Sequence, residues 1–173
     1  MARVAHIERR PIHPMLVFFP VALLVWAVLC EFFWRGGGNW FWYKAGWYSM
    51  GGGLIGAVVA ALFGFNDFMA IRDVETKRKA ATHMLLNVIW LALFIISFFI
   101  RLPLAHQSAP PANGVMPGGY NAAFILSLIG VAFLAVSGWI GMGMVFIDGM
   151  AVDLKVACEH EKEIHGAAAQ PAD

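Results

Sequence analysis

Four long apolar stretches, separated by short polar segments, make up most of the chain. They cover about residues 14–34, 45–69, 81–101 and 121–147. A helix needs ~20 apolar residues to cross the hydrocarbon of a bilayer, and each stretch is about that long. The pattern predicts an all-α integral membrane protein, in which 13–150 form a four-helix up-down-up-down bundle between an N-terminal segment, 1–12, and a C-terminal tail, 151–173.

Basic residues are unevenly divided between the two ends of this bundle. Three belong to one end: Arg35, Lys44 and Arg101. The other nine belong to the opposite end: Arg3, Arg9, Arg10, Arg72, Lys77, Arg78, Lys79, Lys155 and Lys162. Because Lys and Arg accumulate on the cytoplasmic side of membrane proteins, we expect both termini in the cytoplasm and a multi-pass protein of the bacterial inner membrane.

Composition agrees with this class. Of all residues, 60% are hydrophobic and only 13% are charged, which leaves no room for a separate soluble domain. The first stretch ends at Glu31 and three bulky aromatic residues rather than at a small-residue cleavage site, so we expect a retained helix rather than a signal peptide. The net charge of +1 argues against a nucleic-acid partner, which normally requires a basic surface.

Two histidines stand at the starts of alternate stretches. His13 begins the first and His83 the third. In an up-down-up-down bundle the first and third helices are diagonal neighbours that start at the same level, so both imidazoles can approach the centre. Paired histidines are standard axial ligands, and a neighbouring side chain usually orients them. We therefore expect His13 and His83 to bind the iron of a b-type haem, with Asp67, Asn87 and Asp148 as the neighbours that hydrogen-bond and orient the imidazoles.

A charged pair is predicted at the opposite end of the same two helices. Glu31 and Arg101 each follow their histidine by 18 residues, which is five helical turns. A charge within the membrane is costly unless it is paired. We therefore expect Glu31 and Arg101 to form a structural ion pair that joins the first helix to the third.

Small residues recur along the second and fourth stretches at helical spacing. They are Gly53, Gly56, Ala60 and Gly64 in the second, and Gly130, Ser137 and Gly141 in the fourth. Such stripes are typical of close helix packing in membranes, and they also leave space for a flat cofactor. Beyond this shared stripe we find no internal repeat in the sequence.

Four motifs carry a resemblance to a known family. They are Ile12-His13-Pro14-Met15-Leu16-Val17-Phe18-Phe19-Pro20, Gly64-Phe65-Asn66-Asp67, His83-Met84-Leu85-Leu86-Asn87 and Ser137-Gly138-Trp139-Ile140-Gly141. In this order, over about residues 11–152, they resemble the bacterial multi-pass membrane family called domain of unknown function 2231. The chain departs from that pattern at Val145-Phe146-Ile147-Asp148-Gly149, where family members often have a basic or histidine-containing turn. The resemblance implies the topology and a set of positions, but no activity.

The function hypothesis is a haem-binding electron-transfer protein, or a subunit of a respiratory complex, with quinone and other membrane subunits as candidate partners. The alternative is a non-redox structural or accessory subunit, in which His13 caps the first helix and the His/Asp cluster is structural or binds zinc or iron. A nucleophilic enzyme is poorly supported, because Ser127 and Ser137 lie in apolar surroundings with no histidine nearby in the sequence, and His106 belongs to the loop before the fourth stretch. An electron-transfer or non-catalytic role therefore fits better than catalysis.

Overall fold

The computed structural model describes residues 6–7, 10–112 and 116–148. Within them, four helices account for nearly everything: α1 (Ile12–Gly37), α2 (Trp40–Ala70), α3 (Val74–Ala105) and α4 (Tyr120–Phe146). Two short strands, β1 (His6–Ile7) and β2 (Arg10–Pro11), pair in antiparallel fashion ahead of α1. All four helices are long and apolar enough to span a membrane, which confirms the predicted fold class. The predicted tail, 151–173, and most of the segment 1–12 lie outside the described residues.

Helix ends differ from the predicted ones because polar caps and aromatic residues extend the helices. α2 starts at Trp40 rather than near residue 45, since the Oδ1 of Asn39 accepts a hydrogen bond from the amide of Phe41 at 2.9 Å. α3 starts at Val74 rather than near residue 81, since Asp73 caps it through the amide of Thr76 at 2.8 Å. The aromatic run after Asn39 and the basic run after Thr76 are thus helical rather than loops.

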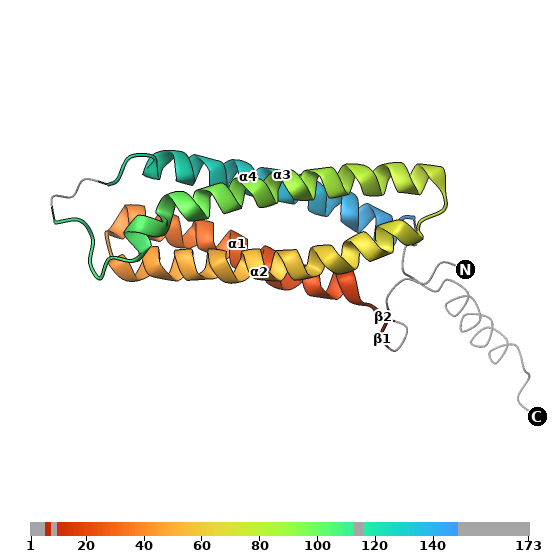
Figure 1. Ribbon diagram of the computed structural model, residues 1–173, viewed down its shortest axis with the longest axis horizontal. Helices are drawn as coiled ribbons and strands as arrows, with labels where there is room; N and C mark the ends of the chain where they lie inside the picture. The colour runs from red at the N-terminus through yellow and green to blue at the C-terminus, as the bar shows by residue number, and fades with distance from the viewer. Residues whose placement is uncertain (1–5, 8–9, 113–115, 149–173) are drawn as a thin grey trace, which may run out of the picture.

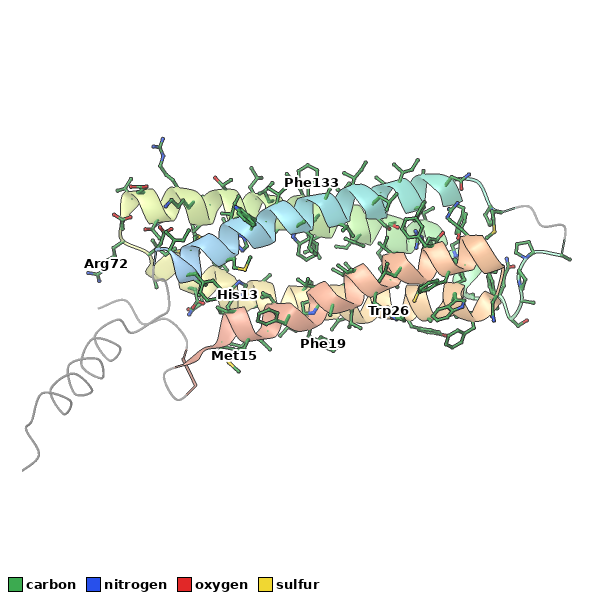
Figure 2. The ribbon with its side chains drawn as sticks, turned by 180° about the vertical axis from the view of Figure 1, so that it is seen from behind. His13, Met15, Phe19, Trp26, Arg72 and Phe133 are labelled. Carbon is green, nitrogen blue, oxygen red and sulfur yellow. The ribbon has the colours of Figure 1, made fainter. Side chains whose placement is uncertain are left out.

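Polar residues lie inside the bundle and large apolar side chains lie outside. Ser97 and Ser127 are fully buried, whereas Phe18, Trp139 and Phe146 are each at least three-quarters exposed. In Figure 2, the side chain of Phe19 projects outward from α1, and it is 63% exposed. A protein in water could not expose so much apolar surface, so this distribution agrees with lipid as the surrounding solvent.

The four helices pack as two hairpins. α1 packs chiefly on α2 and α3 on α4, with fewer contacts between α2 and α3 and fewer still between α1 and α4. Figure 1 shows all four helices running along one long axis. α1 and α3 are therefore diagonal and start at the same end, as the up-down-up-down order requires. We call the end with His13 and His83 the histidine end, and the end with Glu31 and Arg101 the glutamate end.

The two hairpins repeat the same contacts, a repeat that the sequence analysis missed. A Cβ added to Gly53 would lie 2.8 Å from Leu24, and one added to Gly130 would lie 2.9 Å from Phe94. Leu24 and Phe94 are 70 positions apart in the chain, and the two glycines are 77 apart. The same contact is therefore made at equivalent positions of each hairpin.

Further pairs obey the same offsets. His13 and His83, like Glu31 and Arg101, are 70 positions apart, and Tyr43 and Tyr120 are 77 apart. The hydroxyl of Tyr43 donates to the backbone oxygen of Arg101 at 2.9 Å, while the hydroxyl of Tyr120 donates to the carboxylate of Glu31.

Such reciprocal contacts are the sign of a twofold relation. Because both hairpins start at the same end, the pseudo-twofold axis runs along the bundle.

Candidate functional site

The two histidines are held in the same way by the two hairpins. The Nδ1 of His13 lies 2.8 Å from the backbone oxygen of Ala60, and the Nδ1 of His83 lies 2.8 Å from that of Ser137. A carbonyl oxygen can only accept, so both rings carry their proton on Nδ1. Each ring also lies against a glycine that follows its hydrogen-bond acceptor by four residues, where any larger residue would collide with the ring. A Cβ at Gly64 would be 2.7 Å from the Cε1 of His13, and one at Gly141 would be 2.9 Å from the Cε1 of His83.

This geometry assigns a role to part of the small-residue stripe. Gly64 and Gly141 make room for imidazoles, while Gly53 and Gly130 make room for Leu24 and Phe94. At these positions side chains from the partner helix occupy the space above the stripe. At these four positions the stripe serves close packing of adjacent helices.

Asn87 forms a hydrogen bond with the second ring nitrogen of His83, Nε2. The Oδ1 of Asn87 accepts from the Nε1–H of Trp90 at 2.7 Å and from the hydroxyl of Ser137 at 2.7 Å. The amide nitrogen of Asn87 therefore faces the Nε2 of His83, at 2.9 Å, and donates to it. Within this network His83 is neutral, because a proton on Nε2 would face the amide hydrogens of Asn87. His13 has no such amide: its Nε2 has no partner among the described residues.

Of the two carboxylates that were expected near the histidines, Asp148 pairs with a lysine instead. Asp148 lies at the surface, with its oxygens 3.0 and 3.1 Å from the Nζ of Lys79. Asp67 is buried near the histidine end of α2. Nowhere in the described part of the chain do three or more His, Cys, Asp or Glu side chains come together as a metal site, so a set of four ligands from His13, His83, Asp67 and Asp148 is not assembled.

Glu31 and Arg101 meet at the glutamate end. The Nη1 of Arg101 is 3.3 Å from the Oε2 of Glu31, and both side chains are 2% exposed. Arg35, one turn after Glu31, places its Nε 2.8 Å from the Oε1 of the same carboxylate. One buried carboxylate thus pairs with two guanidinium groups. Such a cluster fixes the relative position of the hairpins, because separating them would leave charges unpaired in a medium of low dielectric constant.

Several members of this cluster were not predicted from the sequence. Ser97 donates to the backbone oxygen of Ala123 at 2.8 Å and lies 2.8 Å from the hydroxyl of Ser127, which in turn faces Arg101. Arg35, Tyr43 and Tyr120 also belong to it. Tyr43 and Tyr120 could have been found from their 77-residue offset, which equals that of Gly53 and Gly130.

Comparison with known proteins places the chain in a family. A family model described as "Predicted membrane protein (DUF2231)" matches residues 9–154, which is most of the chain. No curated protein and no solved structure matches it. The family description names no activity, so it supports a membrane-spanning protein and leaves the chemistry to the site. The chain belongs to the DUF2231 family of predicted membrane proteins, as its four motifs indicated.

Proposed function

We propose that this protein is a haem-binding electron-transfer subunit of the bacterial inner membrane, with a b-type haem between His13 and His83. The observation that carries the proposal is the orientation of the two imidazoles. Each donates its Nδ1–H to a backbone oxygen of the adjacent helix, Ala60 or Ser137. Histidines that bind metals commonly donate their other ring N–H in this way, which leaves the Nε2 lone pair for the iron.

The pseudo-twofold relation supports the same arrangement. Glu31 and Arg101 occupy equivalent positions and contact each other, so both lie beside the pseudo-twofold axis. His13 and His83 precede them by five turns on the same helices and so point toward the same axis at the other end. Two equivalent ligands on opposite sides of an axis suit a planar group held between them.

The chain's own residues would hold and tune such a group. The backbone oxygens of Ala60 and Ser137 fix the tautomer of each ring, and Gly64 and Gly141 allow both rings to lie close to the adjacent helix. The amide of Asn87 occupies the Nε2 of His83, so it has to rotate away before that nitrogen can bind iron. A b-type haem supplies one-electron transfer, here between the quinone pool and a partner subunit.

A titration of the apo-protein in detergent with haemin tests this proposal. We expect one haem per chain, with binding lost in His13→Ala and in His83→Ala. His106→Ala is the matched control, because His106 is exposed and lies beyond the glutamate end of α3. Asn87→Ala should bind haem more tightly than the wild type, since it frees the Nε2 of His83. Unchanged haem binding in both histidine variants would exclude the site.

A second candidate is a structural or accessory subunit without a redox group. The observation that favours it is the closed hydrogen-bond network of His83, Asn87, Trp90 and Ser137, in which the polar groups of His83 and Asn87 already have partners. Under this hypothesis Asn87→Ala and Ser137→Ala lower the thermal stability of a folded, colourless protein, and neither changes haem binding. The same titration therefore separates the two candidates.

The proposed location can be tested independently. We propose that both termini face the cytoplasm, because the sequence assigns nine of its twelve basic residues to the side on which the first and third spans begin. A C-terminal green fluorescent protein fusion should then be fluorescent, and a C-terminal alkaline phosphatase fusion inactive. The reverse result would place the histidine end on the outer side of the membrane.

A further inference from the structure

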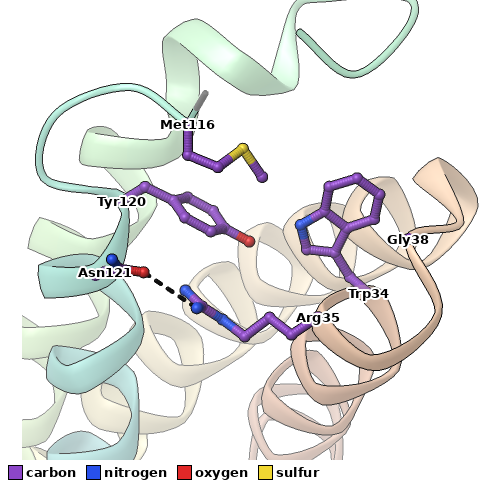
Figure 3. Close-up of a pocket in the computed structure, with 6 residues that line it drawn as sticks. All are labelled: Trp34, Arg35, Gly38, Met116, Tyr120 and Asn121. Atoms are coloured by element: carbon purple, nitrogen blue, oxygen red, sulfur yellow. Dashed lines mark hydrogen bonds between the residues drawn. The ribbon is translucent and has the colours of Figure 1, made fainter. Parts of the chain in front are cut away.

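An open pocket lies at the glutamate end, far along the helices from the histidines. Its volume is about 370 Å³, and its lining comes from α1, the turn before α2, the segment before α4 and the first turn of α4 (Figure 3). The lining residues are Trp34, Arg35, Gly38, Met116, Tyr120 and Asn121. The haem proposal does not use this pocket.

The charge around the pocket is unbalanced. From residue 12 to 66 and from 76 to 147, Glu31 is the single acidic residue of the chain. The same end carries Arg35, Lys44 and Arg101. Glu31 is shared between the two arginines, at 2.8 Å from Arg35 and 3.3 Å from Arg101. The glutamate end therefore holds an excess of positive charge that a bound anion would offset, and such an excess is costly at a low dielectric constant.

Helix dipoles add to this positive potential. α4 begins at Tyr120 after Gly119, whose φ of 86° suits glycine and which provides no side-chain cap. The amide of Tyr120 donates to the backbone oxygen of Pro117 at 3.2 Å, and no side chain caps the amides that follow it. α2 also begins beside the pocket, directly after Gly38 and Asn39, but Asn39 already caps its first turn through the amide of Phe41. Helix N-termini attract anions through their free amides and their dipoles.

Arg35 is held in place for such a ligand. Its Nε bonds to Glu31 and its Nη1 to the Oδ1 of Asn121 at 3.1 Å. Its guanidinium lies 4.7 Å from the ring centroid of Tyr120 and 4.3 Å from that of Phe124. These contacts use two of its three nitrogens, and the side chain is still 30% exposed. A planar guanidinium fixed in this way is well suited to bind oxyanions.

We propose that this pocket binds one phosphate-type oxyanion through Arg35 and the start of α4. The phosphate of a lipid headgroup and free phosphate share this chemistry. Since the pocket lies at the end of the membrane-spanning helices, a lipid phosphate from the adjoining leaflet has direct access to it. The proposal does not depend on haem binding, and either can fail without the other.

Native mass spectrometry of the full-length protein tests the site, with phosphatidylglycerol in one arm and inorganic phosphate in the other. We expect Arg35→Gln and Asn121→Asp each to weaken binding about tenfold or more, which is ~1.4 kcal/mol. Arg72→Gln is the control, because Arg72 is exposed at the histidine end (Figure 2). If Arg35→Gln does not fold, Asn121→Asp decides, since it introduces a charge at an exposed position.

The two arms of this experiment identify the source of the bound phosphate group. Binding of phosphatidylglycerol alone identifies a lipid site, and binding of inorganic phosphate identifies a site for a soluble anion. The proposal is overturned if neither probe binds, or if Arg35→Gln and Asn121→Asp both bind as the wild type does.

Discussion

Replacing Glu31 by Gln should destabilise the bundle more than any other single change of a charged residue. The substitution keeps the size of the side chain and an oxygen that can accept from Tyr120. It removes the one charge that balances Arg101 and Arg35. Because Arg101 is only 2% exposed, it cannot turn to water when its partner is lost.

The expected loss follows from this burial. Removing one partner of a buried ion pair typically costs about 3–5 kcal/mol, because the remaining charge is left without compensation. Here the hydroxyl of Ser127 lies 3.5 Å from the Nη2 of Arg101 and provides some compensation, so we expect about 3 kcal/mol. That is a large part of a typical stability of about 5–15 kcal/mol.

Unfolding in a titration of dodecyl sulfate, followed by far-ultraviolet circular dichroism, measures the change. Glu75→Gln is the matched control, because the side chain of Glu75 is 82% exposed and its bond to Lys79 is a surface pair. If Glu31→Gln unfolds no more readily than Glu75→Gln, the buried charge cluster does not stabilise the bundle.

The remaining predictions concern the pseudo-twofold axis, the packing of α4 and the cap of α3. Glu31→Arg combined with Arg101→Glu should recover part of the stability lost in either single variant, because the two positions are equivalent; double-mutant unfolding curves check this, and no recovery would contradict the equivalence. Gly130→Ala should be less stable than Gly138→Ala by about 1–3 kcal/mol in the same unfolding assay, since a Cβ at 130 meets the ring of Phe94 while one at 138 meets nothing within 4 Å. Hydrogen bonds to the amide of Thr76 lower the pKa of Asp73, so the cap contributes stability above the ordinary pKa of the carboxyl group and loses it as pH falls through the lowered value. Asp73→Asn should remove this acid dependence of the melting temperature and keep the cap, and an unaltered acid dependence would show that other groups cause it.

Much of the fold could be predicted from the sequence, because lipid imposes simple rules on it. The lengths of the apolar stretches predicted four spanning helices. The equal spacing of Glu31 from His13 and of Arg101 from His83 predicted an ion pair between the two diagonal helices. The ends of α2 and α3 were missed by several residues, since aromatic and basic residues look like loop or interface when they are read by hydropathy alone. The capping residues Asn39 and Asp73 were the sequence signal that could have located the starts of these two helices.

The repeat escaped detection for a physical reason. Many equivalent positions keep a contact rather than a residue type: Leu24 and Phe94 both cover a glycine, and Glu31 and Arg101 are opposite in charge. A sequence comparison that rewards identity therefore finds only scattered pairs, such as the two histidines, the two tyrosines and the glycines. Contacts between distant segments, such as that of Asn87 with Ser137, could not be predicted, because they depend on how each helix is rotated about its own axis.

An absorption difference spectrum tests the central claim most directly. The protein is purified from haem-sufficient cells in mild detergent, and its dithionite-reduced spectrum is compared with its oxidised spectrum. The account predicts the sharp reduced bands of a six-coordinate b-type haem in the wild type and their loss in His13→Ala and His83→Ala. A featureless spectrum from a folded sample would contradict it and assign both histidines to the packing of the hairpins.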